Sequence, residues 1–315
     1  MINFAEPFEN RVQNSNNILL AGVGGGFDLL SCLPLYYKLI AEGKQVTLVN
    51  YSNLDLDELN AATDPQVILK DRLFMVGSNM KQWLQHYPSG MVSMWFEQTY
   101  NEQVPVYLML RQSVRQLKEC YQKVIDKHEI DTIIFCGYGM TSIMMGDEEG
   151  CGNMLHSTIN EMAVKDLEVP NKLLVTFGVE TSQRGKVSYN SILDNIALHT
   201  QWKTYLGLAF VYPEDDSFSY MKHCYDFIAS KEHHERSILI ELILLGVHGK
   251  VGKIKEDKIT PLMAHVHCFD LQGVCNANKL GMLIEHLDSY DEIVQHGMST
   301  IQNGNKPRPF IYPEI

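Results

Sequence analysis

Features that identify membrane proteins are missing from this sequence. No apolar run approaches the roughly 18 residues that a membrane-spanning helix needs. The first residues lack the basic stretch and following apolar stretch that mark a signal peptide. We therefore expect a cytoplasmic protein with no membrane partner.

Positive charge is also scarce. The chain has 26 Lys and Arg residues against 38 Asp and Glu residues, which gives a formal net charge of −12. The basic residues are scattered and form no patch. Because an acidic surface repels the phosphate backbone of nucleic acids, we expect no nucleic-acid partner.

Closely spaced cysteines are absent as well. The seven cysteines of the 315 residues lie far apart, and none forms a Cys-x-x-Cys motif. This spacing indicates reduced thiols in a core rather than disulfides or a zinc site. His265 and His267 share one face of a predicted strand and could bind a metal together with His248. No carboxylate or cysteine stands in register with them, so we predict no metal site.

The strongest signal that is present is the stretch from 17 to 30, which reads NILLAGVGGGFDLL. An apolar run, a glycine-rich turn and an amphipathic segment are typical of a buried strand, a tight turn and a helix. Glycine has no Cβ, so a ligand can approach the backbone, and the first N–H groups of a helix favour a phosphate or carboxylate. We predict that Gly24, Gly25 and Gly26 hold an anion and that Asp28 binds a polar group.

Two plainer interpretations stay open at this turn. The glycines also fit a tight turn that is needed only for packing. Asp28 also fits a residue that satisfies N–H groups in the first helical turn, a role worth about 0.5–2 kcal/mol.

Strands and helices alternate along the first two thirds of the chain. A strand at 17–22, a helix at 28–42 and a strand at 45–51 are typical of a right-handed parallel βαβ unit. The alternation continues to a helix at 188–199. It predicts an α/β protein with a Rossmann-like, three-layer α/β/α fold and a mostly parallel sheet.

The rest of the chain gives weaker patterns. We expect one domain over 1–315. The segment 53–103 has little periodicity and is predicted to consist of short helices and loops that serve as a lid or an insertion. The proline-containing tail at 303–315 is predicted to be extended.

A second polar turn, at 137–153, follows another predicted strand. In parallel sheets ligands bind beyond the carboxyl ends of the strands, where this turn and the glycine turn meet. We expect Thr141 and Ser142 to donate hydrogen bonds to a phosphate. Asp147 and Glu148 are the predicted catalytic residues, because adjacent acids in a dry pocket raise each other's pKa and suit proton transfer or a magnesium ion. An exposed loop with solvated charges is the alternative.

A third polar turn follows the predicted strand at 172–178. It contains Glu180 and Arg184, which we assign to the ligand site. An arginine can clamp an anion through two parallel hydrogen bonds, whereas a solvated turn is the plainer interpretation.

The glycine turn does not match the dinucleotide-binding motif Gly-x-Gly-x-x-Gly. Phe27 occupies the third small position, and Asn50 stands where an acid would bind a ribose hydroxyl at the end of the second strand. These departures disfavour NAD. An S-adenosylmethionine-dependent methyltransferase fits slightly better, although Asn50 again replaces the usual acid.

Four segments together resemble the prokaryotic family called domain of unknown function 1152. They are GGGFD at 24–28, GDE at 146–148 with Gly152 after it, FGVE at 177–180 and FDL at 269–271. Their order runs across nearly the whole chain. The resemblance implies a Rossmann-like α/β fold and no particular reaction.

This chain departs from the family pattern at several polar positions. Thr141 stands where the pattern has an aspartate, and Met145 where it has a basic residue. His156 and Ser157 stand where it has an acidic pair. These departures favour a binding protein over an enzyme.

The sequence thus predicts a cytoplasmic protein that binds a small anionic ligand, a nucleotide or a phosphorylated metabolite, at the glycine turn. It assigns neither a reaction nor a cofactor. A non-catalytic sensor or scaffold and a methyltransferase are the alternatives, and a homo-oligomer stays open.

Overall fold

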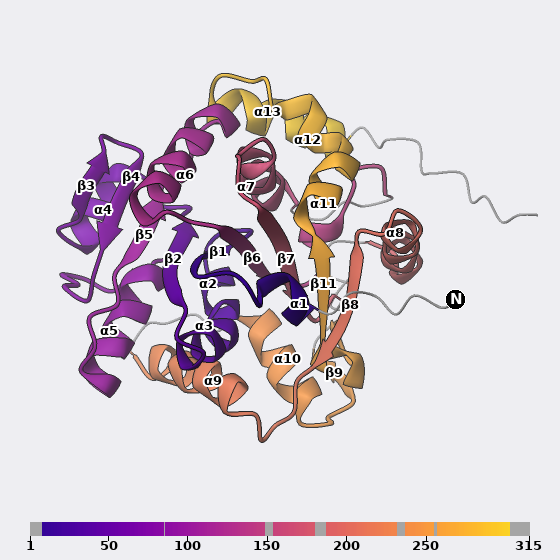
Figure 1. Ribbon diagram of the computed structural model, residues 1–315, viewed down its shortest axis with the longest axis horizontal. Helices are drawn as coiled ribbons and strands as arrows, with labels where there is room; N and C mark the ends of the chain where they lie inside the picture. The colour runs from indigo at the N-terminus through magenta and orange to yellow at the C-terminus, as the bar shows by residue number, and fades with distance from the viewer. Residues whose placement is uncertain are drawn as a thin grey trace, which may run out of the picture.

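The computed structural model describes residues 8–84, 86–148, 154–179, 187–231, 237–254 and 257–302. Its centre is a mixed sheet of nine strands in the order β3-β4-β5-β2-β1-β6-β7-β11-β8 (Figure 1). The strands of this sheet are β1 (Asn17–Gly22), β2 (Gln45–Tyr51), β3 (Gln66–Leu69), β4 (Leu73–Val76), β5 (Val106–Met109), β6 (Thr132–Tyr138), β7 (Asn171–Phe177), β8 (Tyr205–Phe210) and β11 (His265–Asp270). Two short strands, β9 (Gly252–Ile254) and β10 (Asp257–Ile259), pair separately.

Helices contribute to both faces of the sheet. One core contains residues of α2 (Asp28–Ser31), α3 (Leu33–Ala41), α5 (Pro88–Tyr100), α9 (Asp216–Ala229) and α10 (Ile238–Val247). The other contains residues of α6 (Val114–His128), α7 (Leu155–Val164), α8 (Tyr189–Gln201), α11 (Leu271–Ala277), α12 (Lys279–Ile284) and α13 (Tyr290–Gln302). In Figure 1, α6, α7, α11, α12 and α13 gather on one side of the strands, and α3, α5, α9 and α10 on the other. Helices α1 (Phe8–Val12) and α4 (Leu56–Ala62), with the 3₁₀ turns η1 (Thr141–Ile143) and η3 (Pro261–Ala264), complete the elements named here.

Residues of β1 point alternately into these two cores. Ile18 and Leu20 belong to the first, and Leu19 and Ala21 to the second. All four are fully buried. A strand covered on both faces reads as a continuous apolar run, which is why the sequence shows no alternation there.

The predicted parallel sheet is confirmed only for its centre. Strands β5, β2, β1, β6 and β7 are neighbours and parallel. At one edge β3 and β4 are antiparallel, and beyond β7 the strand β11 pairs antiparallel with both β7 and β8. The prediction of a mostly parallel sheet is therefore wrong for the two edges, where local hairpins and the connection into β11 reverse the chain.

The segment 53–103 differs from its prediction of helices and loops. Besides α4 and α5 it contains the hairpin β3–β4, which extends the main sheet next to β5. The hairpin turns at Asp71, whose φ of 62° is the left-handed conformation that Asp tolerates better than most residues. Whether the segment also acts as a lid stays a prediction, and the tail 303–315 lies outside the described residues.

The cysteine prediction is confirmed where the chain is described. Six cysteines are buried and free of disulfides, namely Cys32, Cys120, Cys136, Cys224, Cys268 and Cys275. Cys151 lies outside the described residues. No helix in the described ranges is long and apolar enough to cross a membrane.

Candidate functional site

The glycine turn lies at the point where the strand order changes direction. The chain leaves β1 through α2 and α3 to β2 on one side, whereas β6 pairs with the other side of β1. Helix α7, which follows β6, contributes to the opposite core. In open α/β sheets the crevice at such a point, beyond the carboxyl ends of the strands, is the usual ligand site.

Two glycines in the turn need their conformational freedom for different reasons. Gly25 has φ of 84°, and a Cβ on it would lie 2.8 Å from the carbonyl oxygen of Tyr51. Gly26 has φ of 58°, but a Cβ there would meet nothing within 4 Å. The turn is therefore packed against β2 at Gly25 and open at Gly26.

Asp28 occupies part of the turn. Its Oδ2 accepts a hydrogen bond of 2.7 Å from the N–H of Gly24. In the described part of the chain, the N–H groups of Gly25 and Gly26 donate no hydrogen bond. The turn thus offers two backbone donors to an anion instead of the predicted three, and one of its walls is a carboxylate.

The environment of Asp28 changes its acidity. Burial removes water from the carboxylate and raises its pKa from 3.8 to about 7, although hydrogen bonding from the backbone of Gly24 and Tyr138 opposes the shift. The residue keeps partial contact with solvent even though protein surrounds the carboxylate. Near neutral pH, Asp28 can therefore exist with or without its proton.

Ser142 lies close to Asp28. Its Oγ and the Oδ2 of Asp28 each lie 3.9 Å from the position that a Cβ on Gly137 of β6 would take, so both approach one point. The hydroxyl of Ser142 is buried and has no hydrogen-bond partner among the described residues. A methyl carbon of Val23 lies 2.5 Å from the same point, so a side chain of the protein fills the space between Asp28 and Ser142.

Asn50 shapes the other side of the turn. Its Nδ2 donates to the carbonyl oxygen of Gly26 at 3.4 Å and to Ser89 Oγ at 3.1 Å. Its Oδ1 is buried without a partner in the described chain and lies 3.0 Å from the place of a Cβ on Gly22. Asn50 therefore supports the turn from beneath.

Asn160 on α7 anchors the same turn, and the sequence did not reveal it. Its Nδ2 donates to the carbonyl oxygens of Gly22 at 3.0 Å and Val23 at 2.9 Å. Its Oδ1 accepts a hydrogen bond of 2.6 Å from the hydroxyl of Tyr121. Nothing in the sequence distinguishes Asn160 from the other polar residues of α7, such as Thr158 and Glu161.

Asp147 and Glu148 are buried and engaged by partners outside the glycine turn. The carboxylate of Glu148 accepts hydrogen bonds from the backbone N–H groups of Met145 and Gly146 at 2.8 and 2.9 Å. It also accepts one of 2.7 Å from Asn195 Nδ2 on α8. Asp147 forms an ion pair with Lys279 on α12. These contacts fix the loop to two helices, and the predicted catalytic role of both acids stays a prediction.

The other predicted residues have different outcomes. Thr141 lies in η1, next to Ser142, and its carbonyl oxygen accepts a hydrogen bond of 3.2 Å from Ser157 Oγ. Glu180 and Arg184 lie outside the described residues. The structure thus brings together Gly24–Gly26, Asp28 and Ser142, with Thr141 beside them.

An aromatic cluster adjoins the turn where β2 ends. The ring centres of Tyr51 and His156 are 5.9 Å apart, and His156 Nε2 lies 2.9 Å from the hydroxyl of Tyr290. Arg111, just after β5, places its guanidinium carbon 5.9 Å from the centre of the Tyr290 ring. Burial, and then the positive charge of Arg111, lower the pKa of His156, which favours the neutral ring.

The two histidines of β11, for which no metal site was predicted, share a face as expected and have other contacts. His265 and His267 share a face of β11, where His267 Nδ1 lies 3.1 Å from the hydroxyl of Tyr205. Within the described ranges, no three metal-ligating side chains come together.

Comparisons of the chain with models of protein families, with curated proteins and with solved structures give no significant match. Function is therefore inferred from the geometry of the site alone.

Proposed function

We propose that this chain has a Rossmann-like, three-layer α/β/α fold and binds a small anionic ligand, a nucleotide or a phosphorylated metabolite, at the glycine turn. The strand order supports the fold. Numbered in chain order, the five parallel strands lie as 3-2-1-4-5, the order of doubly wound nucleotide-binding sheets. The observation that carries the proposal is the turn itself, in which the N–H groups of Gly25 and Gly26 have no acceptor among the described residues.

The anion would bind on the open side of the turn. The N–H groups of Gly25 and Gly26 are donors that suit phosphate oxygens. The proton on Asp28 offsets the repulsion that an ionised carboxylate would exert. Since a bound anion favours the protonated form, binding takes up a proton and becomes tighter as the pH falls through about 7.

The contacts of Asp147 and Glu148 favour a sensor or scaffold over an enzyme. Both acids hold the loop to α8 and α12 through described partners. A carboxylate that accepts several hydrogen bonds in a fixed geometry is poorly placed to exchange protons with a ligand. We therefore propose binding and assign no reaction.

A methyltransferase is the second candidate, because of Asp28. S-adenosylmethionine carries a sulfonium and an ammonium, and an ionised Asp28 in the turn suits positive charge. This ligand predicts the opposite pH dependence, with affinity rising as Asp28 ionises.

A thermal-shift and calorimetry screen tests the proposal, with ADP, NAD and S-adenosylmethionine as probes. A ligand at a hundredfold excess over its Kd stabilises the folded chain by about 2.7 kcal/mol. We expect ADP to bind, and we expect Gly26→Trp to abolish binding because its side chain fills the open space at the turn. Gly25 is unsuitable for this test, because a Cβ there meets the carbonyl oxygen of Tyr51.

Gly43→Trp is the matched control. Gly43 has φ of 78° and open space around its Cβ position, but it lies between α3 and β2 at the other end of the strands. Both variants carry the same strain of about 1–2 kcal/mol, so only Gly26→Trp should lose ADP. Equal ADP affinity in the two folded variants, or no binding of ADP by the unchanged chain, would contradict the proposal.

A further inference from the structure

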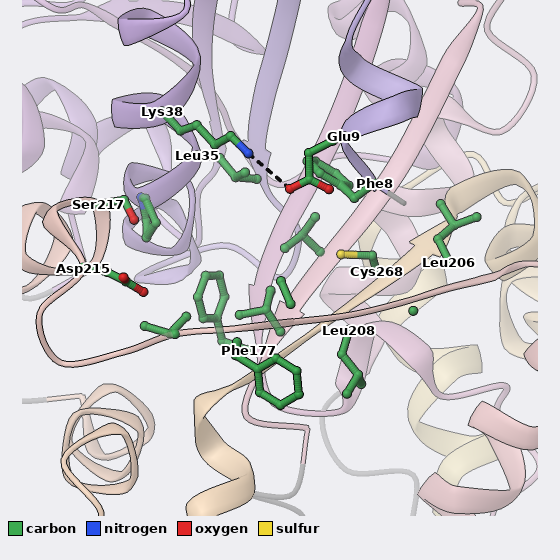
Figure 2. A pocket seen from close by; sticks show the side chains of 17 residues that line it. Phe8, Glu9, Leu35, Lys38, Phe177, Leu206, Leu208, Asp215, Ser217 and Cys268 are labelled. Atoms are coloured by element: carbon green, nitrogen blue, oxygen red, sulfur yellow. Dashed lines mark hydrogen bonds and ion pairs between the residues drawn. The ribbon is translucent and has the colours of Figure 1, made fainter. Parts of the chain in front are cut away.

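A cavity lies away from the glycine turn, on the face of β7, β11 and β8. Figure 2 shows it between these strands, α1 and α3. Its volume is about 490 Å³, within the range of small-molecule sites. None of the residues of the glycine turn lines it.

The floor of this cavity is apolar and built by strand register. Val266 of β11 lies opposite Phe177 of β7, and Cys268 lies opposite Val175. Because side chains two apart on a strand share a face, all four line the cavity. Burial raises the pKa of the Cys268 thiol to about 12, so this wall stays uncharged.

Three of the described residues that line the cavity are charged. Lys38 of α3 and Glu9 of α1 form an ion pair of 3.2 Å, so their charges compensate each other. Asp215 lies at a different wall (Figure 2). Its Oδ2 accepts a hydrogen bond of 2.8 Å from the N–H of Tyr212, and Lys38 is the only cation among the described residues that line the cavity. The carboxylate of Asp215 is thus the excess charge of the cavity.

We infer that this cavity binds a hydrophobic amine, with the apolar part of the ligand on the floor and its ammonium group at Asp215. The apolar floor supplies most of the affinity through burial, and Asp215 selects the charge. An anionic ligand would meet a carboxylate without a compensating cation, in a chain whose formal net charge is −12. The phenyl ring of Phe177 on the same floor also favours a cation over an anion.

Three probes with one apolar body test this inference in the intact chain: 4-phenylbutylamine, 4-phenylbutanol and 4-phenylbutyrate. Calorimetry should show that the amine binds about fivefold tighter than the alcohol, as expected for a partly exposed ion pair, and that the carboxylate binds weakest. Asp215→Asn should lower the affinity for the amine to that for the alcohol, and Asn can keep the hydrogen bond from Tyr212.

The neighbouring acid gives a matched control. Glu214→Gln removes the same charge one residue away, at an exposed position that does not line the cavity, and should leave the preference for the amine unchanged. Ala209→Trp, at an exposed cavity position of β8, should block all three probes. Val67→Trp, at another exposed site on the edge strand β3, should block none.

Several outcomes overturn the inference. They are equal binding of amine and carboxylate, loss of amine preference in Glu214→Gln as well as Asp215→Asn, and undiminished binding in Ala209→Trp. The test is independent of the glycine turn, because Gly26→Trp should still bind the amine. Failure at one site therefore says nothing against the other.

Discussion

The acidity of Asp28 predicts an unusual dependence of stability on pH. The folded chain holds the pKa of this carboxyl near 7, against 3.8 for an ordinary aspartate, because burial disfavours the charged form. Below pH 4 the carboxyl of Asp28 is protonated in both the folded and the unfolded chain, so it does not lower the free energy of unfolding. Between pH 4 and 7 the unfolded chain ionises while the folded chain does not, so the free energy of unfolding decreases as the pH rises.

The size of the effect follows from the shift. About three pKa units correspond to about 4 kcal/mol if the whole difference acts on folding. Asp28 keeps partial contact with solvent, so we expect about half of this value, or about 2 kcal/mol. Replacing Asp28 by Asn removes the ionisation and leaves an oxygen that can accept from Gly24.

Urea unfolding of the unchanged chain and of Asp28→Asn between pH 5 and 8.5 tests this reasoning. The variant should gain stability relative to the unchanged chain as the pH rises, and the difference should level off above about pH 7. If the variant loses the hydrogen bond from Gly24, its free energy of unfolding falls by the same amount at every pH. Asp57→Asn changes an exposed position of α4. Its free energy of unfolding should differ from that of the unchanged chain by the same amount at every pH. If the difference in free energy of unfolding between Asp28→Asn and the unchanged chain is also constant with pH, the reasoning is refuted.

Three further predictions concern the buried polar residues. Asn160→Leu leaves the carbonyl oxygens of Gly22 and Val23 without donors and should cost about 3 kcal/mol in urea unfolding, whereas an unchanged midpoint would exclude the anchor role. Glu148→Ala should speed hydrogen exchange at the amides of Met145 and Gly146 at least tenfold, since it removes their acceptor; equal exchange rates would argue against the clamp. Burial raises the pKa of Glu161 well above its usual range, so Glu161→Gln should become relatively more stable as the pH rises from 5 to 8; a constant difference would count against a neutral Glu161.

The central strands could be predicted from the sequence because their signal is local. The bounds of β1 and β2 agree with the predicted ranges 17–22 and 45–51. Both are apolar or β-branched runs bounded by glycine and polar residues. The predicted helix at 28–42 is divided at Cys32 into α2 and α3, where Pro34 lacks an N–H and begins a new first turn.

The edges of the sheet could not be predicted in the same way. Strands β3 and β4 have four residues each, too few for a clear period of two. A strand that contains His265 and His267 was predicted, but the direction of β11 depends on the path of the preceding connection and not on its own residues. Antiparallel pairing with β7 leaves no mark in a six-residue strand.

The candidate site was predictable where its residues are contiguous. Gly24–Gly26 and Asp28 stand in one motif, so the turn was visible. Asn160 anchors carbonyl oxygens 138 residues away in the chain, and nothing in its neighbours indicates that contact. The partners of Glu148 and Asp147, on α8 and α12, could not be predicted either, because they also lie far from these acids in the sequence.

The measurement that bears most directly on the glycine-turn site is the affinity for ADP at pH 6 and pH 8, in the unchanged chain and in Asp28→Asn. If the protonated form of Asp28 admits the anion, ADP should bind about tenfold more tightly at pH 6, with uptake of a proton. In Asp28→Asn only the small contribution from titration of the phosphate itself should remain. The same pH dependence in both proteins, or tighter binding at pH 8, would contradict an anion site at this turn.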